Sequence, residues 1–302
     1  MKSIEERIEH LKLERGAIII AHNYQPDEVQ AIADFTGDSL ELSRKAAELE
    51  EETVVFCGVH FMAETAAILS PEKTILLPDR FAGCPMADMI TAEQLQAKKA
   101  EHPDAVVITY VNSSAAIKAE SDLCCTSSNA KAVVGSVSAD KEIIFVPDTH
   151  LGHHVQKELG RENMMMWDGY CPTHSRIRDI DILRGKKEHP NAVVMAHPEC
   201  PPSIRDLADR LLSTGQMCAF AKESDAIEFI VATEIGLLYR LRNENPGKKF
   251  YAVSDRAVCP NMKKIDLEKI LWALEDMQYR VTVPEEIANR ARRSIEAMLE
   301  LG

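Results

Sequence analysis

The sequence predicts an α/β protein of three similar three-layer αβα domains, each with a parallel sheet, around a pseudo-threefold axis. The first observation behind this prediction is an internal repeat. Residues 102–107 (His-Pro-Asp-Ala-Val-Val) recur at 189–194 (His-Pro-Asn-Ala-Val-Val), an offset of 87. A Cys-Pro pair occurs three times, beginning at Cys84, Cys171 and Cys259, at offsets of 87 and 88. Several landmarks with one period indicate three copies of one unit.

The second observation is the alternation of short apolar strands with helical segments in each copy. The predicted strands are residues 17–21, 53–57, 73–77, 105–109, 142–146, 163–167, 192–196, 228–232 and 249–253. Between the first and second strands of each unit we expect a helical stretch, a short acidic segment and a helix opened by Ser or Thr. The short acidic segments are residues 33–39, 119–127 and 207–214. This alternation is typical of βαβ units with parallel sheets.

The repeat also predicts the domain boundaries. The first domain is residues 16–103, preceded by a helix in residues 1–15. The second is residues 104–190. The third is residues 191–275, followed by C-terminal helices in residues 276–302.

Composition narrows the class of protein. The 302 residues include 35 Lys and Arg and 48 Asp and Glu, a formal net charge of −13, and 45% are hydrophobic. This composition is that of a folded chain. The acidity argues against a nucleic-acid partner, because a phosphate backbone would be repelled. No apolar run approaches the ~18 residues of a membrane span or forms a signal-peptide core. We therefore expect no membrane association and a cytoplasmic location.

Polar residues follow the first strand of every unit at equivalent positions. One set is His22, Tyr110 and His197, and the other is Tyr24, Asn112 and Glu199. Parallel sheets bind ligands at the carboxyl ends of their strands, so we expect these side chains at a site. They supply acids, bases and hydrogen-bonding groups.

A hydroxyl residue opens the next helix of each unit: Ser39, Ser127 and Thr214. A hydroxyl beside a helix N-terminus can bind an anion. The alternative is plain N-capping. The repetition at three equivalent positions, each beside a polar strand end, favours a binding role.

The three Cys-Pro cysteines form a third equivalent set. Around a pseudo-threefold axis, the thiolates of Cys84, Cys171 and Cys259 would meet at one point. Three thiolates from three loops suit either zinc or an iron–sulfur cluster with one non-cysteine corner. A 4Fe–4S cluster held by three cysteines leaves one iron open to act as a Lewis acid.

Several segments resemble a known family. Residues 21–26 (Ala-His-Asn-Tyr-Gln-Pro) and 33–39 (Ala-Asp-Phe-Thr-Gly-Asp-Ser) resemble the opening of the quinolinate synthases, the "A" proteins of de novo NAD biosynthesis. Further similar segments are Thr109-Tyr110-Val111-Asn112, Thr126-Ser127-Ser128-Asn129, Pro147-Asp148, His197-Pro198-Glu199-Cys200 and Ser213-Thr214-Gly215. They follow the family's order from about residue 15 to 265.

The resemblance implies an enzyme that condenses iminoaspartate with dihydroxyacetone phosphate to quinolinate, phosphate and two waters. It implies a 4Fe–4S cluster on Cys84, Cys171 and Cys259, the set that the repeat also singles out. Functional coupling to an L-aspartate oxidase or an aspartate dehydrogenase would follow. Some family members carry Cys-x-x-Cys-x-x-Cys at the last ligand. Here Cys259 stands alone in that segment, so a thiol switch of that kind is not expected.

The resemblance also implies residue roles. Glu199 is the expected general base, and Tyr24 and His22 would move protons at the triose end. Tyr110 and Asn112 would orient the dicarboxylate, and His197 would bind substrate and shuttle protons. The predicted holders of carboxylate or phosphate groups are Ser39, Ser127, Ser213 and Thr214.

Two other functions stay open at this point. One is a zinc-dependent α/β enzyme acting on a sugar phosphate. The other is an iron–sulfur sensor or scaffold without catalysis. A sensor does not need three pairs of polar residues in register, and no partner-binding module is recognisable in the sequence.

Overall fold

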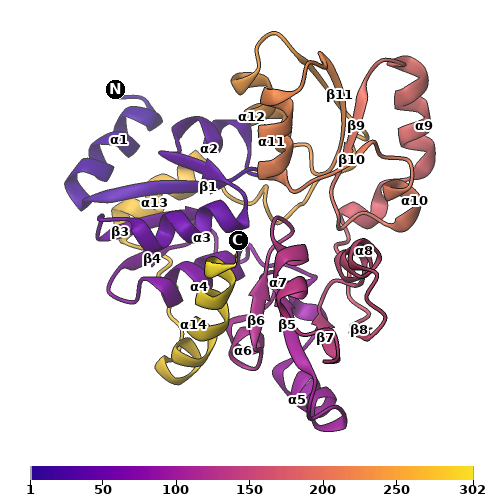
Figure 1. Cartoon of the computed structure of the whole chain (residues 1–302). Helices are drawn as coiled ribbons and strands as arrows, with labels where there is room; N and C mark the ends of the chain where they lie inside the picture. Colours follow the sequence, from indigo (N-terminus) through magenta and orange to yellow (C-terminus); the bar gives the residue numbers. More distant parts are fainter. Residues whose placement is uncertain (1, 302) are drawn as a thin grey trace.

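The chain forms three separate four-stranded parallel sheets around a common centre (Figure 1). This computed structural model describes residues 2–301. The first sheet consists of β1 (Ala17–His22), β2 (Phe35–Gly37), β3 (Thr53–Cys57) and β4 (Thr74–Leu76). The second consists of β5 (Val106–Tyr110), β6 (Leu123–Cys125), β7 (Ile143–Val146) and β8 (Met164–Met166). The third consists of β9 (Val193–Ala196), β10 (Arg210–Leu211), β11 (Glu228–Ala232) and β12 (Lys249–Ala252).

All three sheets have the same topology. Their orders are β2-β1-β3-β4, β6-β5-β7-β8 and β10-β9-β11-β12, and every pairing is parallel. Helices flank each sheet, so the predicted α/β class with three similar αβα units is confirmed. Each sheet lies inside one of the predicted ranges, 16–103, 104–190 and 191–275. The boundaries themselves stay a prediction.

The helices connect successive strands and cover the sheets. Those of the first unit are α1 (Ile4–Arg15), α2 (Asp27–Ile32), α3 (Ser39–Glu48), α4 (His60–Leu69), η1 (Ala87–Met89) and α5 (Ala92–Glu101). Those of the second are α6 (Ala115–Ala119), α7 (Ala130–Ser136), α8 (Thr149–Leu159), η2 (His174–Arg176) and α9 (Asp179–Glu188). The third unit has α10 (Pro202–Arg205), α11 (Thr214–Glu223) and α12 (Leu237–Glu244).

The short acidic segments contain an edge strand that the sequence analysis missed. Asp34, Asp122 and Asp209 precede β2, β6 and β10 at equivalent positions. Each carboxylate accepts the backbone N–H of the neighbouring first strand, from Ile19, Val107 and Val194, at 2.8 Å in all three units. The aspartate thus pairs one backbone N–H on the edge of the first strand of its unit. The edge strand then pairs with that first strand over two or three residues. Strands this short carry no alternating pattern, so the sequence shows only the aspartate.

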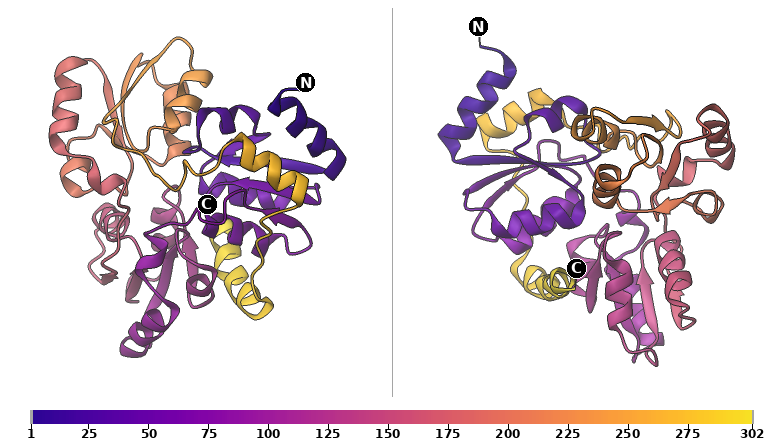
Figure 2. Two further views of the ribbon diagram at one scale, coloured as in Figure 1. Left: turned by 180° about the vertical axis from the view of Figure 1, so that it is seen from behind. Right: turned by 45° about the horizontal axis from the view of Figure 1, so that its top comes forward.

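The two C-terminal helices return to the first and second units. α13 (Leu267–Asp276) packs on α1 and β3, and α14 (Glu285–Glu300) packs against α6, β6 and α4. Figure 2 shows both helices, in yellow, away from the third unit. α14 therefore closes the outside of the junction between the first and second units. Within residues 2–301, no helix combines the length and apolarity needed to cross a membrane.

Candidate active site

One buried cavity lies where the three units meet. Its volume is about 60 Å³, and its walls come from loops at the carboxyl ends of strands in all three sheets. The predicted site residues that line it are His22, Tyr24, Ser39, Cys84, Tyr110, Asn112, Ser127, Cys171, His197, Glu199, Thr214 and Cys259. Ser213 lies just outside, fully buried at the start of α11. The structure thus brings the predicted residues together, while their roles stay predictions.

His22 and His197 are held in the same way in the first and third units. The backbone N–H of Tyr24 donates to His22 Nδ1 at 3.1 Å, and that of Glu199 donates to His197 Nδ1 at 3.3 Å. Since Nδ1 accepts, the proton of each neutral ring sits on Nε2. Burial lowers the pKa of His22 to about 4 and that of His197 to about 3, against the opposing charge of Glu199. Both rings are therefore neutral donors near pH 7.

Glu199 is an ionised carboxylate inside the protein. Only 3% of it is exposed, and its oxygens lie 2.8 Å from His174 Nδ1 and 3.4 Å from Asn112 Nδ2. Burial alone would raise the pKa of Glu199. The adjacent His174 ring, with hydrogen bonds to the carboxylate from His174 and Tyr110, outweighs burial and holds the pKa of Glu199 below its usual range. The contact of His197 Nδ1 with the carboxylate, at 3.5 Å, is not a charged pair, because that nitrogen already accepts a backbone N–H.

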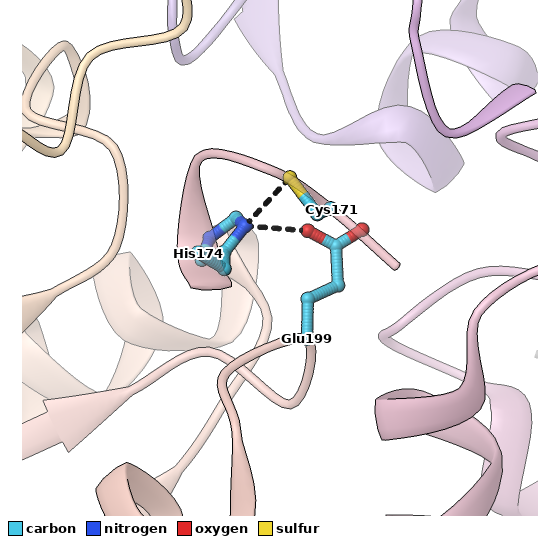
Figure 3. A group of neighbouring side chains, drawn as sticks. All are labelled: Cys171, His174 and Glu199. Atoms are coloured by element: carbon cyan, nitrogen blue, oxygen red, sulfur yellow. Dashed lines mark hydrogen bonds and ion pairs between the residues drawn. The ribbon is translucent and has the colours of Figure 1, made fainter. Parts of the chain in front are cut away.

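A continuous hydrogen-bonded chain joins Tyr24 to Glu199. The phenol oxygen of Tyr24 lies 2.6 Å from Thr233 Oγ1, which lies 2.8 Å from His174 Nε2. His174 Nδ1 faces the Glu199 carboxylate (Figure 3). Burial raises the pKa of Tyr24 well above its usual value, so the phenol keeps its proton. One polarity satisfies every group: Tyr24 donates to Thr233, Thr233 to His174, and His174 to Glu199.

Sequence reasoning missed His174 and Thr233. His174 has no histidine at the equivalent repeat positions, Ala87 and Met262, so only its place three residues after Cys171 marks it. Thr233 directly follows β11, the second of the three strands predicted for its unit from the sequence. The strand-end rule that found Glu199 would have found Thr233 if it had been applied to second strands as well.

Ser39, Ser127 and Thr214 line the cavity, and none of the three is an N-cap, so plain N-capping, the alternative to a binding role, does not apply to them. Asp38 caps α3, and Ser213 caps α11, so Ser39 and Thr214 are first helical residues. Ser127 precedes α7 by three residues and lies 3.2 Å from His197 Nε2. With the capping done by the preceding residue, the hydroxyls of Ser39 and Thr214 are not needed as caps.

Asp38, which the sequence analysis did not single out as a site residue, ties the three units together at this point. Its Oδ1 accepts the backbone N–H groups of Leu40 and Glu41 at 3.0 and 2.9 Å. Its Oδ2 accepts the hydroxyls of Ser128 and Ser213 at 2.7 and 3.2 Å, from the second and third units. One carboxylate therefore caps a helix and joins all three loops.

The three predicted ligand cysteines reach the cavity from three loops. Cys84, Cys171 and Cys259 follow β4, β8 and β12 and are half-buried, and every cysteine among residues 2–301 is a free thiol. Burial raises the pKa of Cys84 to about 12 and raises that of Cys171 well above its usual value. A bound metal displaces such a proton, because the thiolate is the ligand. The donor set fits a group held by one thiolate from each unit.

A second arrangement could also hold a metal. Ligand atoms of Cys171, His174 and Glu199 all lie within 4.8 Å of one another (Figure 3). His174 Nδ1 lies 3.1 Å from Cys171 Sγ as well as 2.8 Å from the carboxylate. A sulfur, a nitrogen and an oxygen donor at this spacing suit a zinc ion.

The fold and the cavity define an α/β protein whose acid, base and thiol groups from three repeats share one site. A model of the family described as quinolinate synthetase A protein matches residues 6–300. The chain is 56% identical over 298 residues to a quinolinate synthase of Dehalococcoides mccartyi, and the aligned region covers 99% of this chain and 98% of that protein. Identity is 52% to the quinolinate synthase of Methanoregula boonei, with the same coverage. It is 53% over 299 residues to that of Geobacter metallireducens, again covering 99% and 98%. The chain belongs to the quinolinate synthetase A protein family, and it is an enzyme.

Proposed function

We propose that this enzyme condenses iminoaspartate with dihydroxyacetone phosphate to quinolinate, phosphate and two waters, as a step of de novo NAD biosynthesis. The observation that carries the proposal is the shared cavity, where three thiols lie beside a connected set of acids and bases. Imine formation, isomerisation and dehydration all require proton transfers at positioned groups. Relatives with the same printed name and near-complete coverage support it.

We propose that Cys84, Cys171 and Cys259 hold a 4Fe–4S cluster. The support is their convergence on one cavity, one from each unit, with no fourth cysteine in the described lining. When bound, such a cluster supplies a Lewis acid at its one non-cysteine iron.

The base in this proposal is Glu199 acting with His174. A substrate proton taken by Glu199 lies one hydrogen bond from His174 and three from the Tyr24 phenol. In the resting polarity the chain passes a proton from the Tyr24 phenol toward Glu199, and it passes one from Glu199 toward the phenol once the Thr233 hydroxyl has turned and the His174 ring proton has shifted from Nδ1 to Nε2. Such a relay lets a proton removed at one substrate atom return at another, as isomerisation and dehydration require.

The neutral histidines and the hydroxyls bind the substrates in this proposal. The Nε2–H donors of His22 and His197 can bind carboxylate or carbonyl oxygens without adding charge. Ser39, Ser127 and Thr214 lie beside helix starts, where hydroxyl and backbone N–H groups favour anions, and Ser213 caps α11 behind them. Tyr110 and Asn112, both in contact with Glu199, would orient the dicarboxylate.

The proposal also covers the location of the enzyme and the source of its iminoaspartate. We propose a cytoplasmic enzyme that receives iminoaspartate from an L-aspartate oxidase or an aspartate dehydrogenase. The chemistry requires such a supplier, because an imine of this kind hydrolyses readily in water.

The second candidate is a zinc enzyme acting on a sugar phosphate, and the Cys171–His174–Glu199 group is the observation that favours it. Metal analysis separates the two. After anaerobic purification or reconstitution, about four irons per chain with sulfide and a broad thiolate-to-iron absorption support the cluster. One zinc and no iron would favour the alternative.

The activity test incubates the reconstituted chain with dihydroxyacetone phosphate and iminoaspartate formed from oxaloacetate and ammonia. We expect quinolinate and phosphate in equal amounts. A chain that holds its full iron content and forms no quinolinate would refute the proposed reaction.

A further inference from the structure

Three polar side chains occupy one position of the repeat and do not reach the cavity. They are Gln30 in α2, Lys118 in α6 and Arg205 in α10, at offsets of 88 and 87. Gln30 and Lys118 are buried, and Arg205 is half-buried. Each lies on the short helix that follows the first strand of its unit.

Each of these side chains donates a hydrogen bond to a backbone carbonyl of a neighbouring unit. Gln30 Nε2 lies 2.9 Å from the oxygen of Gly236, in the third unit. Lys118 Nζ lies 3.5 Å from the oxygen of Phe61, in the first unit. Arg205 Nη1 lies 2.7 Å from the oxygen of His150, in the second unit. The first unit thus bonds to the third, the second to the first and the third to the second, which closes a ring.

The three acceptors are equivalent as well. The strand registers pair Ala21 with Cys57, Thr109 with Val146 and Ala196 with Ala232. The acceptor is the fourth residue after the second member of each pair: Phe61, His150 and Gly236. Donor and acceptor therefore both follow the repeat, and the three contacts are copies of one contact.

On their own side, Gln30 and Lys118 hold the loop that carries the polar cavity residues. Gln30 Nε2 also donates to the Gln25 carbonyl at 2.8 Å, and Lys118 Nζ to the Ser113 carbonyl at 2.7 Å. Gln25 and Ser113 are equivalent positions. They lie one residue beyond Tyr24 and Asn112 respectively, so each contact fixes the end of a polar loop.

On the far side, each acceptor adjoins the anchor of a cysteine loop. The residues before the acceptors are His60, Thr149 and Ile235. Their backbone N–H groups donate to the carbonyls of Ala82, Gly169 and Ala257 at 2.7, 2.8 and 3.0 Å. Each of these carbonyls lies two residues before a cavity cysteine, Cys84, Cys171 or Cys259.

We propose that Gln30, Lys118 and Arg205 are equivalent positioning residues: each holds the cysteine loop of a neighbouring unit in place, and Gln30 and Lys118 also fix the polar loop of their own unit against it. The catalytic meaning of this role rests on the proposed function, because it assumes that the cysteines and the polar loops serve one reaction. The structural part of the proposal, that each of three contacts holds one cysteine loop in place, does not rest on the proposed function.

The chemistry of Lys118 argues for a positional role. Its side chain is fully buried, yet no carboxylate oxygen in residues 2–301 lies within 4 Å of its ammonium group. The carbonyls of Ser113 and Phe61, and the ring of Phe61 at 5.2 Å, surround it instead. A buried charge is costly without donors and acceptors in place, so the ammonium favours only arrangements in which both carbonyls are present.

The test replaces each donor by methionine, which keeps an unbranched side chain and removes the hydrogen bond: Gln30→Met, Lys118→Met and Arg205→Met. Backbone hydrogen exchange is then measured by mass spectrometry in three cysteine-loop segments, residues 255–261, 80–86 and 167–173. We expect each variant to speed exchange at least about tenfold in one segment only: 255–261 for Gln30→Met, 80–86 for Lys118→Met and 167–173 for Arg205→Met. Lys118→Gln, which carries the donor of its equivalent Gln30, is the matched control and should keep residues 80–86 protected.

This one-to-one pattern supports the proposal. Faster exchange in all three segments together, or no change in any, would overturn it, because the first means general destabilisation and the second means no positioning. If Lys118→Met does not fold, the other two variants test the proposal by the same pattern. Arg205 is only half-buried, and Gln30→Met removes no charge. In the reconstituted enzyme we expect kcat to fall about tenfold with little change in KM. A one-to-one exchange pattern in a chain that forms no quinolinate would refute the proposed function and leave the ring of contacts standing.

Discussion

The first and third units hold a histidine at the same strand end, by the same backbone hydrogen bond, and differ in the residue two positions on. In the first unit that residue is Tyr24, whose pKa is raised by burial, so that it stays a neutral phenol. In the third it is Glu199, an ionised carboxylate supported by His174 and Tyr110. The repeat therefore supplies one geometry, and a single side chain in each copy decides whether that position gives or takes a proton.

The two positions are also connected. Thr233 and His174, neither of which belongs to the repeated pattern, link the phenol to the carboxylate. The repeat places two similar strand ends at the cavity, and these two residues join them into one hydrogen-bonded path. The variants at Glu199, Tyr24 and Thr233 alter the two ends of this path and its middle.

The largest expected effect comes from removing the charge of the third-unit end. In Glu199→Gln, the proton acceptor is lost while size and shape are kept. We expect the rate of quinolinate formation to fall roughly 10³-fold, the middle of the range for general acid–base groups. Glu228→Gln, on the surface beside Lys249, is the control and should leave the rate unchanged. Full turnover by Glu199→Gln with its iron content intact would remove Glu199 as the base.

The first-unit end should give a smaller loss. Tyr24→Phe keeps the ring against His22 and removes the phenol proton. We expect kcat to fall about 10²-fold, at the lower end of the same range, because His22 still offers a donor nearby. Equal losses in kcat/KM and kcat would indicate that the phenol acts in the transition state. A change in KM alone would show that Tyr24 only binds substrate.

The middle of the path is tested by a pair of substitutions at Thr233. Thr233→Val has nearly the same shape but cannot pass a proton or hydrogen-bond to His174, so we expect kcat to fall about tenfold. Thr233→Ser restores the hydroxyl and should recover most of the rate. If valine and serine behave alike, the loss arises from packing and the path does not run through Thr233.

The buried neutral histidines predict a pH dependence of stability. His22 has a pKa of about 4 in the folded chain against about 6.5 when unfolded. Between these values the unfolded chain binds more protons, so the free energy of unfolding falls as the pH drops from 6.5 to 4. The contribution of His22 is on the order of 3 kcal/mol across that window. The free energy of unfolding can be measured by urea titration at several pH values from 7 to 4.5. It should fall less steeply with decreasing pH for His22→Asn than for the parent chain, and an equal pH dependence in the two chains would contradict this.

The fold was predictable from sequence to the extent that repetition reveals it. The offsets of 87 and 88 locate the central strands and place His22, Tyr110 and His197 at equivalent strand ends. The edge strands β2, β6 and β10 were not predictable, because their pairing depends on Asp34, Asp122 and Asp209 holding the neighbouring strand, a contact that spans 15 residues.

The site was predictable in part for a similar reason. Polar residues at equivalent positions after the first strands could be predicted from the repeat, whereas His174 and Thr233 have no counterpart of the same type in the other units. The contacts of Gln30, Lys118 and Arg205 obey the repeat, but they run between units, and the sequence does not state which unit neighbours which. The arrangement of the units is set by packing between residues far apart in the sequence.

The most direct test of a site shared by three units is the iron content of cysteine variants after anaerobic reconstitution. Cys84→Ala, Cys171→Ala and Cys259→Ala each remove a thiol that lines the cavity, and Cys124→Ala, on β6 beside Ser294, serves as the control. We predict about four irons per chain for the parent and for Cys124→Ala, and a loss of most iron and visible absorption in each of the other three. If any one of Cys84→Ala, Cys171→Ala or Cys259→Ala keeps the full iron content, the three units do not share one cluster.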